Sequence, residues 1–238
     1  MTPLRQRFID DLRLHNLAPR SIKAYVAGVA KLARFAGRSP DQLGPEDVRR
    51  FQLSLLDRKV SWAQYNQTVT ALRWLFGVTL KRPDAVPAVR FGHRPRRLPV
   101  ILSTDEVVAF LEAARPGRDR VLFQTTYACG LRLKEVLGLR VADIDSARMF
   151  VVVRQGKGAK DRLVPLSPRL LGELRAYWRT ARPRTWLFPG AGGNRPLSPA
   201  AVQKVVKRTR QAAGIAKPAT LHTLRLASAY YYTSQRWA

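Results

Sequence analysis

The first eighty residues repeat apolar side chains every three or four positions, the spacing that gathers them on one face of a helix. Ser21 is placed to cap the second apolar segment and Gly37 to end it. Pro45 suits the first turn of the third segment, and Ser61 suits the cap of the fourth. The expected helices span residues 4–17, 22–36, 45–56 and 62–80. They predict a small helical bundle over residues 1–80.

The stretch from residue 81 to residue 99 interrupts this pattern. Four prolines break any helix, and six Lys and Arg residues repel one another and keep the chain extended. We expect residues 81–99 to form a basic linker that can follow an anionic groove. The alternative is a solvated hinge without specific contacts.

Residues 100–238 predict a second domain that mixes helices with one hairpin. Ser103 and Glu106 form a capping box before an apolar run. Residues 149–153 and 162–166 alternate as strands around a Gly-Lys-Gly turn, which predicts a β-hairpin. Further helices are expected over residues 119–128, 167–182 and 198–213. Trp178 is expected on the buried face of the helix over residues 167–182. The expected fold class is mainly α with a small β-hairpin or sheet (α+β).

The net charge of the chain narrows the class of partner that we expect it to bind. The chain carries 43 Lys and Arg against 16 Asp and Glu, a formal net charge of +27, so it should attract a polyanion. No apolar run is long enough to span a bilayer, which favours nucleic acid over a membrane. A single cysteine, Cys129, excludes an intrachain disulfide and fits a reducing cytoplasm. It lies in an apolar run and is expected to be a small core residue.

One arginine stands in a pattern suited to binding an anion. Gly130 can turn the chain sharply after the preceding apolar run, and the next helix then begins near Arg132. Glu135, three residues later, can hold the guanidinium of Arg132 as a fixed fork aimed at a phosphate. The alternative is an ordinary surface ion pair, which contributes little.

Three motifs in this order resemble the tyrosine recombinase, or phage integrase, family. They are residues 128–139 around Arg132, residues 155–166 around Lys157, and Leu-His-Thr-Leu-Arg at 221–225. The resemblance covers nearly the whole chain and implies an N-terminal SAM-like core-binding domain before a catalytic domain. It also implies that Arg132 and Arg225 cradle a scissile phosphate, with Glu135 in support, that Lys157 is the general acid, and that His222 assists proton transfer.

The chemistry that this resemblance implies is phosphoryl transfer without a metal or any other cofactor. A tyrosine attacks a DNA phosphodiester and forms a 3′-phosphotyrosyl link, while cations hold the charge that develops on the phosphate. The expected partner is double-stranded DNA, with self-association on it and no membrane, in the bacterial cytoplasm at the nucleoid. The expected DNA contacts are Arg73, Arg94, Arg96, Arg97, Lys160, Arg162, Lys204, Lys207 and Arg208.

The end of the sequence departs from the family pattern. We expect the pattern to stop after Arg225, through a truncation or a shifted reading frame, so that the nucleophilic tyrosine is absent. Tyr230, Tyr231 and Tyr232 follow too soon after Arg225 to serve as that nucleophile. The sequence thus predicts a recombinase that binds DNA without cleaving it alone. The alternatives are a non-catalytic DNA-binding derivative of the family and an unrelated basic RNA-binding protein.

Overall fold

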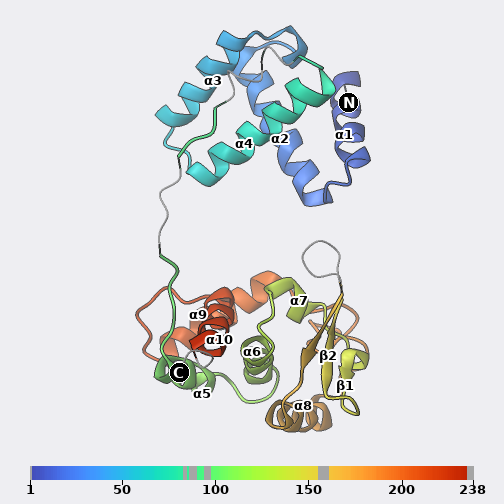
Figure 1. The fold of residues 1–238 in the computed structure, drawn as a ribbon, viewed down its shortest axis with the longest axis vertical. Coiled ribbons are helices and arrows are strands. Elements are labelled where there is room, and N and C mark those ends of the chain that lie inside the picture. Colours follow the sequence, from blue (N-terminus) through green and yellow to red (C-terminus); the bar gives the residue numbers. More distant parts are fainter. Residues whose placement is uncertain (1, 83–84, 86–89, 94–97, 155–160, 235–238) are drawn as a thin grey trace. The chain divides into compact units, whose positions relative to one another are not determined.

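The N-terminal helices begin where local capping signals stand. The computed structural model describes residues 2–82, 85, 90–93, 98–154 and 161–234, the last five of these by their backbone alone. Its first helices are α1 (Pro3–Leu14), α2 (Pro19–Ala36), α3 (Pro45–Asp57) and α4 (Trp62–Trp74), with a 3-10 turn, η1 (Pro40–Gln42), before α3 (Figure 1). Helix α4 continues as one π-helical turn, η2 (Leu75–Thr79). Each of the four α-helices overlaps one of the expected segments.

Of the four helix signals expected over residues 1–80, Gly37, Pro45 and Ser61 are confirmed and Ser21 is wrong. The Ser61 hydroxyl accepts from the backbone N–H of Gln64, and Gly37 ends α2 in the left-handed conformation at φ 65°. Helix α2, however, begins at Pro19, with Ala18 rather than Ser21 at its cap position. Proline in the first turn fixes the helical backbone angle without losing a needed donor, so the helix starts before the serine.

The chain divides into two compact units, residues 1–97 and 98–238, called here the first and second unit. The core of the first unit is apolar and includes Phe8, Leu32, Phe51, Leu72 and Phe76, each at most 2% exposed. A separate core in the second unit is built around Phe110, Phe123, Val151, Phe188 and Leu224. Each unit thus has its own hydrophobic core, as an independently folding domain requires.

Part of the expected linker is bound to the first unit. Ala85 is fully buried in its core, and the side-chain amide of Asn66 exchanges two hydrogen bonds with the backbone of Gly92, at 2.8 and 3.0 Å. The carbonyl of Arg90 accepts from Gln52 (2.8 Å) and from the Tyr65 hydroxyl (3.2 Å). We call residues 85 and 90–92 the strap. Side chains of α3 and α4 therefore fix the chain direction well beyond residue 80.

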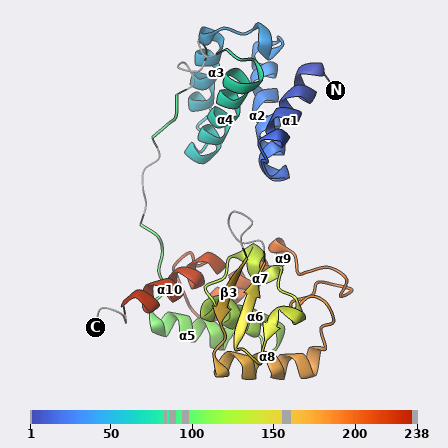
Figure 2. The same ribbon diagram turned by 45° about the vertical axis from the view of Figure 1, so that its right-hand side comes forward.

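The second unit is helical with one small sheet, which confirms the mainly α class (Figure 2). Its helices are α5 (Thr104–Ala113), α6 (Arg118–Ala128), α7 (Leu133–Leu137), α8 (Pro168–Ala181), α9 (Pro199–Ala212) and α10 (Leu221–Ser234). The strands β1 (Ile144–Asp145), β2 (Phe150–Val153) and β3 (Arg162–Pro165) pair antiparallel in that order, after the 3-10 turn η4 (Val141–Asp143). The predicted hairpin is β2 and β3, and β1 is an additional edge strand.

Helices α6 and α10 pack together in the second core and position the site described next. Leu224 and Ala227 of α10 are fully buried, and Ser228 is 2% exposed. The segment after Arg225 is thus a continuous part of a packed helix. No helix in the described part of the chain is long and apolar enough to cross a membrane.

Candidate phosphate-binding site

The site is built on the turn between α6 and α7. Gly130 adopts φ 56°, a left-handed angle that glycine tolerates without strain, and it directs the chain from the end of α6 toward Arg132. Arg132 then occupies the cap position of α7 in an extended conformation. The turn therefore presents an arginine at the start of a helix, as the sequence predicts.

Glu135 holds this arginine from one turn inside α7. Its carboxylate accepts from the backbone N–H of Arg132 at 2.8 Å and from the guanidinium Nη1 of the same residue at 2.7 Å. The Glu135 side chain is only 5% exposed, so the pair is not the surface ion pair that was the alternative. A buried carboxylate fixes the direction of a guanidinium far better than a solvated one does.

Arg225 reaches the same turn from α10, although it is far away in the sequence. Its Nε donates to the carbonyl oxygen of Gly130 at 2.9 Å. Burial lowers the pKa of Arg225, and the positive charge of Arg132 lowers it further. The structure thus brings Arg132 and Arg225 to one place, each held by a single end of its guanidinium.

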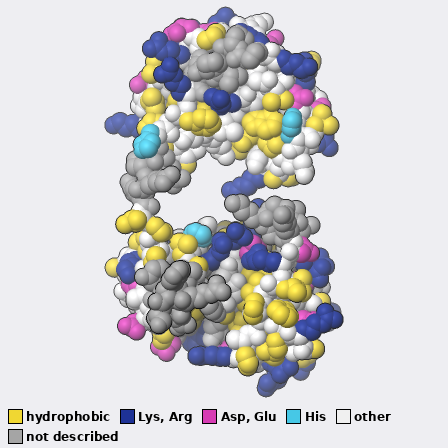
Figure 3. Space-filling view, in the orientation of Figure 1, with side chains coloured by type: hydrophobic (Ala, Val, Ile, Leu, Met, Phe, Trp, Pro, Cys, Tyr) yellow, Lys and Arg dark blue, Asp and Glu magenta, His cyan; other side chains and the backbone are white. Residues whose placement is uncertain are grey.

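The other ends of both arginines are open within the described part of the chain. No protein hydrogen bond there occupies Nε or Nη2 of Arg132, or Nη1 and Nη2 of Arg225. Two guanidinium groups with open ends beside one turn form a candidate site for a small anion. Figure 3 shows Lys and Arg side chains gathered around α7, beside the hairpin.

A further arginine, Arg162, also contacts Glu135. Its Nη1 and Nη2 lie 3.0 and 2.8 Å from the two carboxylate oxygens. Burial raises the pKa of Glu135, and the hydrogen bonds from Arg162 and Arg132 outweigh that effect and bring it to about 2. Glu135 is therefore ionised throughout the neutral range.

Of the remaining predicted catalytic residues, His222 lies within the described part of the chain and Lys157 lies outside it. His222 is exposed and lies one turn before Arg225 on α10, so the two share a helix face. Lys157 and Lys160 fall in residues 155–160, outside the described residues. That segment joins Val153 to Arg162, which are partners in the β2–β3 ladder. The predicted general acid therefore lies, in sequence, five residues from an arginine of the site.

The predicted DNA contacts have different environments. Lys204 and Lys207 are exposed on α9, whereas Nη2 of Arg208 binds Asp119 of α6 at 3.1 Å. The guanidinium of Arg73 lies over the ring of Phe91 in the strap, 5.5 Å from its centroid. Arg94, Arg96 and Arg97 lie outside the described residues. Their contact with DNA stays a prediction.

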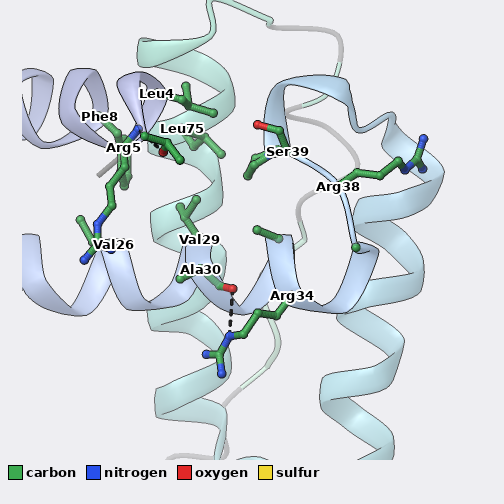
Figure 4. A pocket seen from close by; sticks show the side chains of 14 residues that line it. Leu4, Arg5, Phe8, Val26, Val29, Ala30, Arg34, Arg38, Ser39 and Leu75 are labelled. Carbon is green, nitrogen blue, oxygen red and sulfur yellow. Dashed lines mark hydrogen bonds between the residues drawn. The ribbon is translucent and has the colours of Figure 1, made fainter.

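Cys129 and a pocket in the first unit offer no alternative active site. Cys129 is 6% exposed, and burial raises the pKa of its thiol to about 11, so it is the core residue that we expected. The pocket, of about 800 Å³, lies between α1 and α2 on a floor of Leu4, Phe8 and Val26 (Figure 4). The described residues that line it include arginines but no acid, histidine, cysteine or lysine that could act as a general acid or base.

Comparison with known proteins identifies the family. The profile of the phage integrase family matches residues 101–237, and that of the phage integrase N-terminal SAM-like domain matches residues 4–84. The first match extends past Arg225, where we expected the family pattern to stop.

Individual proteins of this family align with the chain over most of their own length. A putative integrase/recombinase, y4qK, of Sinorhizobium fredii is 42% identical and aligns over 97% of this chain and 76% of its own. A tyrosine recombinase of Pseudothermotoga lettingae is 30% identical over 94% of this chain and 82% of its own. A lambda integrase dimer bound to a COC′ core site shares the fold, with a TM-score of 0.80 at 19% identity, over 98% of this chain and 89% of that one. The chain therefore belongs to the phage integrase family of tyrosine recombinases, whose members carry out site-specific DNA recombination.

Proposed function

We propose that this chain binds double-stranded DNA and holds one phosphodiester between Arg132 and Arg225 for strand cleavage and rejoining through a 3′-phosphotyrosyl intermediate. The observation that carries the proposal is that Arg225 binds the Gly130 turn that leads to Arg132, whose guanidinium Glu135 holds. Within the described residues the outer nitrogens of both arginines are open. Fixed cations of this kind stabilise the charge that develops on phosphate oxygens in the transition state.

The proposed mechanism assigns one task to each group. A tyrosine oxygen attacks phosphorus, the bond from phosphorus to the 5′ oxygen breaks, and the leaving oxygen takes a proton. Lys157 supplies that proton, and His222, on the face of α10 that carries Arg225, assists its transfer. Glu135 is not a proton donor, because its pKa of about 2 keeps it ionised, and the same low pKa makes it a weak base.

DNA as the partner is supported by charge and by structural neighbours. The net charge of +27 favours a polyanion. The neighbours include a lambda integrase dimer bound to a core site and a lambda integrase tetramer bound to a Holliday junction. We infer that this chain, too, assembles with further copies on DNA, at the nucleoid of a bacterial cell.

The nucleophile is the part of the reaction for which residues 1–238 offer the least support. Burial raises the pKa of Tyr65 and of Tyr177, and their hydroxyls donate to the carbonyls of Arg90 and Leu187. Neither is suited to attack a phosphate. Because Tyr230, Tyr231 and Tyr232 follow Arg225 too closely in the sequence, we propose that residues 1–238 bind DNA without cleaving it alone, and that a tyrosine outside these residues completes the reaction. The second candidate function is a DNA-binding derivative without catalysis.

DNA binding is expected to weaken steeply with salt. Each neutralised phosphate contributes about −0.9 to the slope of log K against log salt concentration. Replacing the exposed Lys204 and Lys207 by alanine together should reduce that slope by up to about 2. Fluorescence anisotropy of a labelled duplex at several salt concentrations measures it. Arg148→Ala, which removes an exposed arginine beside Asp145, is the matched control; affinity that does not change with salt would contradict the proposal.

Covalent chemistry is tested separately with a nicked duplex that traps the cleaved strand. Residues 1–238 are expected to give no protein–DNA adduct on a denaturing gel, while a complete family member on its own site gives one. An adduct that disappears when Tyr230, Tyr231 and Tyr232 are all changed to phenylalanine would show that the nucleophile is one of these three. That result would overturn the non-cleaving part of the proposal and leave the phosphate site intact.

A further inference from the structure

Arg162 uses both terminal nitrogens of its guanidinium within the protein. They bind the two oxygens of Glu135 in a fork, at 3.0 and 2.8 Å, between the first residue of β3 and the middle of α7. The side chain of Arg162 is 35% exposed and that of Glu135 is 5% exposed. Glu135 thus occupies the end-on fork of this guanidinium, formed by one N–H of each terminal nitrogen, so Arg162 does not offer that fork to a phosphate.

The same carboxylate orients Arg132. Oε1 accepts from Nη1 of Arg132 and Nη1 of Arg162, while Oε2 accepts from the backbone N–H of Arg132 and Nη2 of Arg162. Four donors satisfy the four acceptor positions of a carboxylate. The direction of Arg132 is therefore set by a group whose own position Arg162 determines.

Charge gives the second reason for this arrangement. Glu135 paired with Arg132 alone would form a neutral couple and would weaken the attraction of Arg132 for an anion. With Arg162 on the same carboxylate, two positive charges share one negative charge. The pKa of Arg225 is lowered by burial and by Arg132, raised by Glu135 and lowered to a smaller extent by Arg162, so both charges of the Glu135–Arg162 pair act on the second arginine of the site.

We propose that Arg162 is a positioning residue of the phosphate site: it holds Glu135 so that the open nitrogens of Arg132 face the phosphate, and it acts on DNA binding through Arg132 rather than through a phosphate contact of its own. This inference rests on the proposed function of the Arg132–Arg225 site. The inference differs from the expectation that Arg162 contacts the DNA backbone directly. It also connects the hairpin, whose sequence includes Lys157, to the turn that carries Arg132.

A double-mutant cycle on the full chain tests the proposal. The affinity for a labelled duplex is measured for wild type, Arg132→Ala, Arg162→Ala and the double variant at one low salt concentration. Arg162→Ala is expected to lower the affinity about fivefold alone and less than twofold in the Arg132→Ala background, because it acts through Arg132. An equal loss in both backgrounds would overturn the proposal and indicate an independent DNA contact.

Arg162→Lys separates positioning from charge. An ammonium keeps the charge but cannot bridge both oxygens of Glu135, so we expect the affinity to stay well below that of wild type. A direct phosphate contact would be largely restored by lysine, and full affinity would overturn the proposal. This variant also keeps the test valid if Arg162→Ala unfolds, which thermal unfolding followed by circular dichroism would reveal.

Arg154→Lys is the matched control. Arg154 follows β2 at the other side of the same hairpin, and its Nε binds the buried carboxylate of Asp143 at 2.8 Å. Asp143 contacts no arginine of the phosphate site, so this variant should bind DNA as wild type does in either background. If Arg132→Ala itself leaves the affinity unchanged, the proposed function of the site fails. If Arg132→Ala weakens binding but is additive with Arg162→Ala, only the positioning role fails.

Discussion

Phe110→Ala is expected to lower the free energy of unfolding of the second unit by about 3–5 kcal/mol and to leave that of the first unit unchanged. Phe110 is 1% exposed and packs edge to face against Phe123, with the ring centroids 4.9 Å apart. Removing a fully buried ring leaves a cavity that neighbouring side chains fill only in part. Because the two cores share no residue, the loss should stay within one unit.

Urea unfolding followed by hydrogen exchange measures this effect. Hydrogen exchange read by mass spectrometry reports separately on peptides of the two units. The matched control is Phe76→Ala, which removes a fully buried ring from the first unit and should destabilise that unit alone. Equal destabilisation of both units by either variant would show that they unfold as one cooperative body.

Glu135→Gln is expected to cost about 3 kcal/mol of stability at pH 7, because the carboxylate binds two arginines more strongly than an amide can. The pKa of Glu135 is held at about 2, below its ordinary value of 4.5. A depressed carboxylate pKa stabilises the fold above the ordinary pKa, and that stability is lost as the pH falls toward the folded value. The difference between wild type and Glu135→Gln should therefore shrink between about pH 4.5 and pH 2.

Chemical unfolding at a series of pH values checks this prediction. Glu112→Gln, an exposed glutamate at the end of α5, is the matched control and should change stability little at any pH. A gap between wild type and Glu135→Gln that stays constant down to pH 2 would argue against an ionised, arginine-bound Glu135.

Local signals in the sequence predicted the helix boundaries well. Ser61, the Ser103–Glu106 capping box and Gly37 each act within one helical turn, so neighbouring residues are enough to locate them. Ser21 failed because Pro19, two residues earlier, opens the helix first. Strand β1 was missed because two residues are too short for a recognisable alternation.

Long-range contacts set the limits of prediction. The sequence placed Glu135 beside Arg132. It did not predict the fork of hydrogen bonds from Arg162 to Glu135, because Arg162 is 27 residues away and no local pattern contains both residues. The Gly130–Arg225 hydrogen bond spans 95 residues and was not predicted; family resemblance implied only that Arg132 and Arg225 lie at one phosphate. Trp178 was expected inside, yet it is 40% exposed, and the guanidinium of Arg182 lies 4.4 Å from its ring centroid. This cation–π contact stabilises the partly exposed ring of Trp178.

The strap has a consequence for how the two units find DNA. Gly92 is held by Asn66, and Leu102 is fully buried in the second core. These two fixed points are ten positions apart in the sequence. A chain of that length reaches at most about 36 Å. Once either unit holds a duplex, the other is confined to a small volume, where its effective concentration is of the order of millimolar. Under the proposed function, contacts of the two units with DNA would reinforce one another, and loosening the strap would weaken that effect.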